Sequence, residues 1–560
     1  MKRKIGVVFC VLFLFSLLPV PASAQVTVVK TEPAFTLQLT SWKIAPVAAN
    51  TTLGAAVATE GTEDAAVALP GYDTQQWESA VVPGTVLGNL LDNGVYDPIF
   101  TEDNDGKKNV FYSDNMSKIP PSDFAQPWWY STDFSVPAAE AGKRISIQFK
   151  GISYTGEVYV NGQKLHNQNL NIKSEDELKN APPVVSELTD ITSAAPAASS
   201  LRNDLVFDEY KALFKGTMRT YDVDITDCVH ADGRPNNIKV KVTKPVYSTD
   251  LTYYWVDWNP QPADTMMGLT GEVTVTTSGP ARLDNPAVAS AVAEDHSAAD
   301  LSLYVDVSNM SAAPLTGSLS AVIRDPAGQV VTALTKAGVQ VAPGAYNQEI
   351  ALRPDEFPQL HLADPQLWWP YLSGDQPLYT VDYQFSVGGA VSDGLHHRFG
   401  VREIGAEVNV SPYANQNGAS ISNNSLANML QIYVNHRPIL LKGGGYCASD
   451  LFLRHSAATN RAVVDYVKYM GMNMIRDEGK FFDNDLLDLL DENGILLMTG
   501  WCCCDRWQSP GAWSKAERFV AFESLYSQMR NARSHTSMFI WFNGSDNPPS
   551  ISSTGTNGKQ

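Results

Sequence analysis

Ile495-Leu496-Leu497-Met498-Thr499 is a short apolar run that lies between two helical stretches, Asn484–Asn493 before it and about Lys515–Arg533 after it. The same rotation of strand and helix continues through the region after Glu403. Its other expected strands are Ile439-Leu440-Leu441, Asn473-Met474-Ile475 and Phe539-Ile540-Trp541-Phe542, and its other expected helix covers about Thr459–Met470. Strict rotation of strands and helices predicts parallel βαβ units.

Four such units do not complete a barrel. A (β/α)8 barrel takes roughly 250 residues, and the region 404–560 is shorter than that. We therefore expect residues 404–560 to form the first half of a TIM barrel, with four further units missing from the chain.

Upstream of Glu403 the apolar residues alternate with period two instead. Examples are Ile145–Phe149 and Glu157–Gly162, which ends in the turn-forming pair Asn161-Gly162, and this pattern indicates antiparallel strands. Residues 25–280 are expected to form a jelly-roll-like β-sandwich with an insertion at about 171–200, and residues 281–403 an immunoglobulin-like β-sandwich. The predicted fold class is thus multidomain β plus α/β: two β-sandwiches followed by an incomplete (β/α)8 TIM barrel.

The first 24 residues combine a basic start, an apolar run from Ile5 to Leu18 and a small-residue ending, Ala22-Ser23-Ala24. This pattern predicts a signal peptide at 1–24 and a secreted protein, extracellular or periplasmic, with no membrane anchor. The net charge of −19 argues against nucleic acid as a partner. It suits cationic ligands, although acidity can also serve solubility alone.

The spacing of the cysteines and histidines predicts no metal site. After the signal peptide five cysteines remain, Cys228, Cys447 and the run 502–504, and none has the spacing of a zinc ligand set. A single disulfide is possible, and buried packing is the favoured role. His396-His397, His455 and His535 also lack metal-ligand spacing and are interpreted as structural or supporting residues.

Two acidic segments follow expected parallel strands. Arg476-Asp477-Glu478 comes after Asn473–Ile475, and Asn543-Gly544-Ser545-Asp546-Asn547 comes after Phe539–Phe542. Catalytic groups of α/β barrels lie at the carboxyl ends of strands, yet acidic residues there can equally cap the next helix. Both interpretations stay open on the residues alone.

Trp501, Trp507, Trp513 and Trp541 also lie on or near expected strand ends, where indole faces can stack on sugar rings. For each of them core packing is the alternative. The run Gly443-Gly444-Gly445 lacks the other residues of a phosphate loop, so we interpret it as a tight turn after the first parallel strand.

Several segments together resemble glycoside hydrolase family 2. They are Trp128-Trp129-Tyr130, Gly151–Leu165, Gly268–Val273, Leu367-Trp368-Trp369-Pro370, Arg398-Phe399-Gly400-Val401-Arg402, Asn435-His436-Arg437-Pro438 and Arg533–Ser537 followed by Trp541. Most members of the family have Gly-Asn-Glu where this chain has Gly544-Ser545-Asp546. Together with Asp257-Trp258-Asn259-Pro260 and Arg476–Gly479, this replacement is similar to the exo-β-D-glucosaminidase branch, which acts on chitosan oligosaccharides.

The resemblance implies a retaining, cofactor-free enzyme that removes D-glucosamine from non-reducing ends. It makes Asp546 the general acid/base and places Glu478 in an acidic subsite for the sugar's ammonium group. Asp477, Trp541 and Ser545 are the further substrate-binding candidates. The nucleophile would be a Glu on a later barrel strand, which this chain does not reach, so the polypeptide alone is expected to be inactive.

Three alternatives remain at this stage. One is another family-2 activity, such as β-mannosidase or β-galactosidase, against which Asp at position 546 argues. A second is a non-catalytic carbohydrate-binding protein, and a third is a gene model that stops early. The oligomeric state does not follow from the sequence.

Overall fold

The computed structural model describes residues 35–47, 64–167, 169–170, 214–253, 260–410, 428–447, 450–454, 456–478, 483–501, 506–508 and 513–542. The expected signal peptide (1–24), the insertion (171–200), Ser545 and Asp546 lie outside these ranges. Within the ranges, no helix is both long and apolar enough to cross a lipid bilayer.

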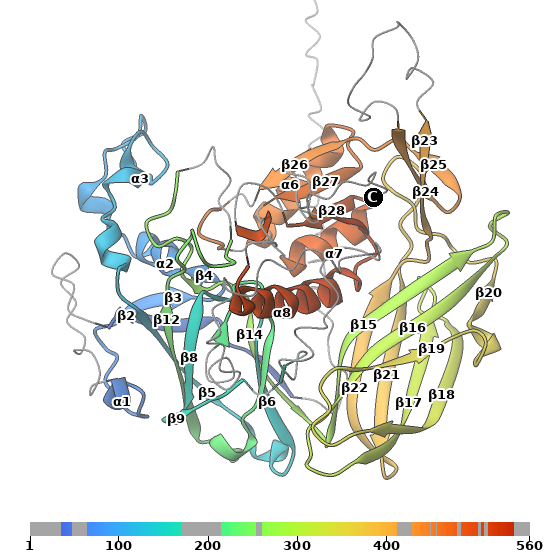
Figure 1. Ribbon diagram of the computed structural model, residues 1–560, viewed down its shortest axis with the longest axis horizontal. Helices are drawn as coiled ribbons and strands as arrows, with labels where there is room; N and C mark the ends of the chain where they lie inside the picture. The colour runs from blue at the N-terminus through green and yellow to red at the C-terminus, as the bar shows by residue number, and fades with distance from the viewer. Residues whose placement is uncertain are drawn as a thin grey trace, which may run out of the picture.

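The first part of the chain is a β-sandwich, at the left of Figure 1 in blue to green. One sheet has the order β1-β14-β6-β11, the other runs β10-β8-β12-β5-β2-β3 with β9 beside β8, and a small sheet joins β4, β13 and β7. The strands are β1 Thr36–Gln38, β2 Ser41–Pro46, β3 Glu78–Val81, β4 Gly84–Thr85, β5 Trp128–Ser135, β6 Arg144–Phe149, β7 Ile152–Ser153, β8 Thr155–Val160, β9 Gln163–Lys164, β10 Phe214–Lys215, β11 Tyr221–Asp224, β12 Pro235–Thr243, β13 Gly268–Leu269 and β14 Val273–Ser278. The α-helices are α1 Asp64–Val67, α2 Val86–Asp92 and α3 Asn115–Lys118, and the 3-10 turns are η1 Asp97–Ile99, η2 Pro121–Phe124, η3 Ala138–Glu140 and η4 Thr226–Cys228.

Helix α2 begins at a buried carboxylate. Asp264 accepts backbone N–H bonds from Leu87 and Met266, both at 2.9 Å, and it is fully buried. Burial raises the pKa of Asp264 to about 6, because a charged carboxylate loses its hydration in the interior.

We predict that this site makes stability depend on pH. The folded-state pKa of Asp264 exceeds the unfolded value, so the folded state binds more protons and its advantage is lost as pH rises through about 6. Relative to the Asp264→Asn variant, the wild type should lose about 1 kcal/mol of unfolding free energy between pH 5.5 and 7.5. Urea unfolding of both proteins at the two pH values measures this difference, and a constant difference would contradict the assignment.

The second part is another β-sandwich, at the right of Figure 1 in yellow-green to yellow. Its sheets have the orders β15-β16-β19, with β20 beside β16, and β18-β17-β21-β22. The strands are β15 Ala281–Val292, β16 Ala298–Asn309, β17 Leu315–Arg324, β18 Val330–Val341, β19 Gln348–Leu352, β20 His361–Ala363, β21 Tyr379–Val387 and β22 Ala390–Phe399, with the 3-10 turn η5 Pro358–Leu360. An antiparallel sheet of β23 Ile404–Val410, β24 Asn428–Val434 and β25 Arg437–Ile439 follows.

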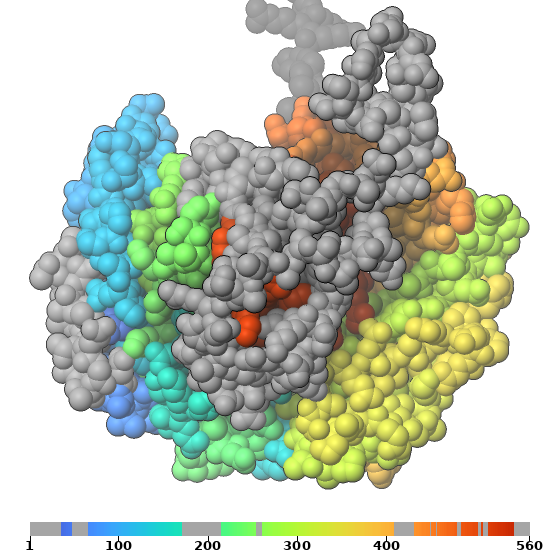
Figure 2. Space-filling model, in the orientation of Figure 1, coloured from blue at the N-terminus to red at the C-terminus, as the bar shows by residue number. Residues whose placement is uncertain are grey.

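The last described part is a parallel α/β unit, orange to red in Figure 2. Its sheet has the order β26-β27-β28-β29, and all three strand pairs are parallel. The elements are β26 Gly443–Cys447, α6 Ala457–Tyr469, β27 Met474–Glu478, α7 Asn484–Asn493, β28 Leu496–Gly500, η7 Arg506–Gln508, α8 Lys515–Ala532 and β29 Met538–Phe542. The predicted rotation of strands and helices is therefore confirmed, and the protein is multidomain and mostly β with a parallel α/β part at the end.

Local signals fix these helices. Asp483 caps α7 and Gly494 ends it in a left-handed conformation, which glycine adopts without a Cβ clash. Ser514 and Glu517 form a capping box at the start of α8.

Two predictions for the first parallel strand are wrong. Ile439 ends the antiparallel strand β25, and residues 440–442 form no strand. The first parallel strand is the glycine run itself, with Gly443 opposite Met474 and Cys447 opposite Glu478. Glycine is needed at Gly443 because a Cβ there would lie 2.1 Å from the carbonyl oxygen of Met474.

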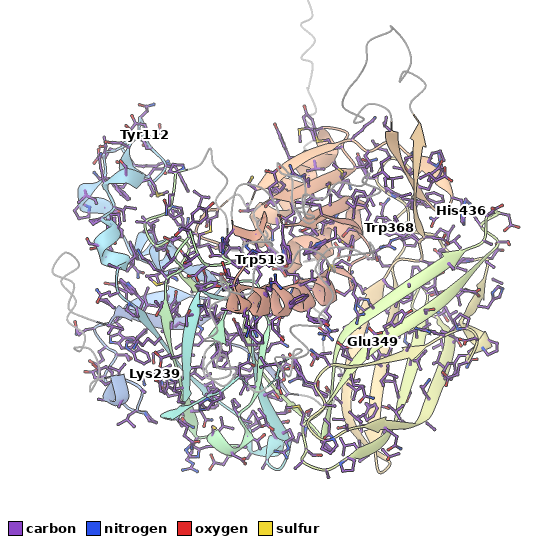
Figure 3. The ribbon with its side chains drawn as sticks, in the orientation of Figure 1. Tyr112, Lys239, Glu349, Trp368, His436 and Trp513 are labelled. Atoms are coloured by element: carbon purple, nitrogen blue, oxygen red, sulfur yellow. The ribbon has the colours of Figure 1, made fainter. Side chains whose placement is uncertain are left out.

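Helix α8 joins all three parts. It lies across the space between the two sandwiches in Figure 1, and Figure 3 labels Trp513 near its start and Glu349 near its other end. Arg219 of the first sandwich pairs with Glu523 of α8. At the far end, Arg530 pairs with Asp306 of β16 at 2.8 Å.

Candidate active site

The carboxyl ends of β26, β27, β28 and β29 meet at one edge of the parallel sheet. Glu478 is the last residue of β27 and lies opposite Cys447, the last residue of β26. Gly500 and Phe542 end the next two strands and are paired with each other. Ligands of α/β sheets bind at this edge because the strand-end loops leave it open.

Strand β27 runs through the whole of Arg476-Asp477-Glu478, which the sequence had placed after the strand. Side chains of a strand alternate between the two faces of its sheet. Ile475 packs with α6 and α7 in one apolar cluster, so Ile475 and Asp477 belong to the helix-covered face. Arg476 and Glu478 belong to the opposite face, which we call the inner face.

The inner face holds a compact charged group at the strand ends. The guanidinium of Arg476 donates to Oε1 of Glu478 and lies 5.1 Å from the ring centre of Phe542. Oε2 of Glu478 makes no hydrogen bond within the described ranges. The Glu478 side chain is only 11% exposed, so its charge is poorly screened by water.

Gly445 of β26 leaves room for this carboxylate. A Cβ at Gly445 would lie 2.6 Å from Oε1 of Glu478, which is closer than nonbonded atoms approach. The glycine run therefore lets Glu478 lie flat against the neighbouring strand.

Asp477 is separated from this group although it precedes Glu478 in sequence. Its side chain is buried, and Thr499 donates to its Oδ2 at 3.5 Å. Its Oδ1 has no partner within the described part of the chain. Burial first, and then the negative charges of Glu478 and Asp483, hold the pKa of Asp477 well above its ordinary value. Asp477 is thus a buried carboxyl behind the strand, where burial favours its neutral form.

Trp541 also lies on the helix-covered face, because it is paired with Thr499 across the sheet. Its ring centre is 6.1 Å from that of Trp501. Trp501, Trp507 and Trp513 are 2%, 1% and 4% exposed and pack with Tyr253 and Met218 of the first sandwich. For these three, core packing is the correct alternative, since no indole face is open to a sugar.

Of the five site residues predicted from sequence, the structure therefore places Glu478 at the inner face and Asp477 and Trp541 behind it. Ser545 and Asp546 lie outside the described ranges, although β29 carries the chain to the same edge. Phe542, Gly445 and the orienting role of Arg476 were not predicted from the sequence. If the strand had been expected to continue to Glu478, the alternation of its side chains would have put Arg476 and Glu478 on one face of the sheet.

Comparisons with known proteins agree with this architecture. The model of glycosyl hydrolases family 2 matches residues 281–402, and the family-2 galactose-binding domain-like model matches residues 65–172. An exo-β-D-glucosaminidase of Streptomyces avermitilis is 30% identical over 502 residues, covering 87% of this chain and 45% of that protein. One of Amycolatopsis orientalis is also 30% identical, over 87% of this chain and 39% of that protein.

Solved structures give the same result. The exo-chitosanase of Amycolatopsis orientalis superposes with a TM-score of 0.66 at 27% identity, covering 90% of this chain and 49% of that one. A Bacteroides uniformis β-glucuronidase shares the fold at 16% identity, with a TM-score of 0.57. The chain spans less than half the length of these curated relatives. With both family models matched in order, the chain belongs to glycoside hydrolase family 2.

Proposed function

We propose that the chain supplies the sugar-recognising side of a retaining exo-β-D-glucosaminidase, which removes β-linked D-glucosamine from the non-reducing ends of chitosan or its oligosaccharides. The relatives named exo-β-D-glucosaminidase support the substrate class. A complex of the exo-chitosanase with PNP-β-D-glucosamine supports it as well.

The observation that carries the proposal is the position of Glu478. Its nearly buried carboxylate stands at the carboxyl end of β27, and Arg476 fixes its orientation through Oε1. No other described residue forms a hydrogen bond with Oε2. A glucosamine ammonium group at Oε2 gains a Coulombic contact in a poorly screened place. The acetamide of N-acetylglucosamine is neutral and bulkier, so it gains no such contact.

The chemistry needs two carboxyl groups about 5–5.5 Å apart, one as proton donor and one as nucleophile. Asp546, preceded by Ser545, would be the general acid/base just after β29. The nucleophile would be a Glu on a later strand of the (β/α)8 barrel, whose first four strands would be β26 to β29. We also propose that the protein is exported, because residues 1–24 have the pattern of a signal peptide.

Replacing Glu478 by Gln should weaken binding of glucosamine-terminated chitosan oligosaccharides by about 10- to 100-fold, because a charged hydrogen bond becomes a neutral one. Weak binding of N-acetylglucosamine oligomers should not change. Isothermal titration of the purified chain with both ligand series measures this. The matched control is Glu102→Gln, which changes an exposed carboxylate of the first sandwich.

Equal affinity of wild type and Glu478→Gln for the amino sugar would refute the proposed subsite. Turnover is tested separately with p-nitrophenyl β-D-glucosaminide on the longest product of the gene. Hydrolysis of the mannoside or galactoside instead would reject the glucosaminidase assignment. Binding without any product would make the chain a carbohydrate-binding protein.

A further inference from the structure

Two acidic residues of α7 and one histidine come together behind the parallel sheet. Asp488 and Asp491 are one helical turn apart on α7, so they share a face of that helix. His535 lies in the turn between α8 and β29. Ligand atoms of the three side chains all lie within 4.8 Å of one another.

These three side chains are not equally satisfied. Asp491 accepts from Ser537 N at 2.6 Å, and its Oδ2 lies 2.9 Å from Nδ1 of His535. Asp488 makes no hydrogen bond within the described ranges, and its Oδ1 lies 3.8 Å from the same imidazole nitrogen. One carboxylate of the group is therefore free to take a further ligand.

A fourth side chain, His397 from the second sandwich, lines the same cavity but lies outside the group whose ligand atoms are within 4.8 Å of one another. His397 of β22 is 4% exposed, and its Nε2 has no hydrogen-bond partner among the residues that the structure describes. It lines a small cavity of about 20 Å³ together with Asp488, Asp491 and His535. An unpaired buried nitrogen costs about 1–3 kcal/mol, and the cavity holds one water-sized sphere.

We propose that Asp488, Asp491, His535 and His397 bind a divalent transition-metal ion, most suitably Zn²⁺, in this cavity. Two imidazoles and two carboxylates are a donor set for tetrahedral Zn²⁺ and are poorly suited to Ca²⁺ or Mg²⁺, which prefer oxygen ligands alone. The four proposed ligands could not be recognised from their spacing in the sequence, because they come from β22, α7 and the turn before β29.

Two neighbouring cations are paired with carboxylates outside the group. Arg398, which also lines the cavity, is paired with Glu492 at 2.9 Å. Lys150 is paired with Glu272 at 2.7 Å. A third cation, Arg402, donates to the backbone carbonyls of Thr536 and Met538.

The site also has an entrance. Asp488 and His535 line both the small cavity and a larger pocket of about 360 Å³ between the two sandwiches and α8. An ion can therefore reach the carboxylate of Asp488 without unfolding of either sandwich. Once bound, it would fasten β22 of the second sandwich to the α/β part, and this role is independent of the proposed glucosaminidase activity.

The test is metal titration of the purified chain after removal of metals with a chelator. Zn²⁺ should bind as a single ion that depends on Asp488, and it should raise the melting temperature by about 3 °C or more at 100-fold excess over its dissociation constant. Co²⁺ should give the visible d–d absorption bands of tetrahedral coordination. Mg²⁺ and Ca²⁺ should give neither effect.

The key variant is Asp488→Asn, which removes one ligand without breaking a hydrogen bond and should lower Zn²⁺ affinity at least about 10-fold. His397→Phe keeps the ring stacked near Phe399 and should have a similar effect. Asp465→Asn, on the exposed face of α6, is the matched control. The cysteines are unchanged in all these proteins, so affinity that is equal in wild type, Asp488→Asn and His397→Phe would overturn the site, as would the absence of Zn²⁺ binding.

Discussion

Replacing Arg219 by Ala is expected to lower the free energy of unfolding by about 3 to 5 kcal/mol, because a buried ion pair would lose one partner. The side chains of Arg219 and Glu523 are 2% and 3% exposed, and their charged atoms lie 3.6 Å apart. Without Arg219, a carboxylate would remain in the interface between the first sandwich and α8.

The arginine does more than balance a charge. Its guanidinium donates to the carbonyl of Lys215 at 2.7 Å and lies 4.9 Å and 5.3 Å from the rings of Tyr221 and Phe519. These contacts connect β10 and β11 to α8, so their loss should separate the sandwich from the α/β part. Urea unfolding followed by circular dichroism reports the change in midpoint.

Two controls separate charge from packing. The double variant Arg219→Met with Glu523→Met replaces the pair by apolar side chains and should recover most of the loss. Arg234→Ala breaks an exposed pair with Asp232, 65% and 49% exposed, and should cost less than about 1 kcal/mol. A loss below 1 kcal/mol for Arg219→Ala would show that the interface tolerates the loss of this arginine.

The parallel unit could be predicted from sequence wherever its elements carry periodic apolar side chains. Helix α7 begins and ends where expected, at Asn484 and Asn493, because capping residues bracket a regular apolar face. Strand β26 was missed because Gly443-Gly444-Gly445 has no side chains from which a period can be read. Its strand geometry comes from pairing with β27, which is a tertiary effect.

The candidate site was only partly predictable for a related reason. Arg476-Asp477-Glu478 could be assigned to the sheet edge, but the division between its two faces depends on where β27 ends, and strand ends are poorly fixed by local sequence. The group around His535 was not predictable, since Asp491, His535 and His397 come from three elements that meet only in the folded chain. Spacing rules for metal sites detect ligands on one element or one loop.

Replacing Trp501 by Ala is the second change with a large expected effect, a loss of about 3 to 5 kcal/mol of unfolding free energy. The indole is 2% exposed, and its ring centre lies 4.8 Å, 6.0 Å and 6.1 Å from those of Trp507, Trp513 and Trp541. Its N–H donates to Gln528 of α8 at 2.9 Å. Alanine would leave a cavity and an unpaired amide together.

Trp501→Phe should cost less, because a ring still fills most of the space while the hydrogen bond to Gln528 is lost. Tyr469→Ala is the control for an aromatic ring outside the core, since Tyr469 is 87% exposed, and it should change stability little. Thermal unfolding followed by tryptophan fluorescence measures all three variants.

The backbone N–H of Trp501 also bonds to the carbonyl of Phe542 at 2.9 Å, and Phe542 contacts Arg476 beside Glu478. Trp501→Ala keeps this backbone bond but removes the ring contact with Trp541 of β29, so it should weaken amino-sugar binding as well. Stability equal to that of Tyr469→Ala would contradict the cluster's role in holding β28 and β29 in place.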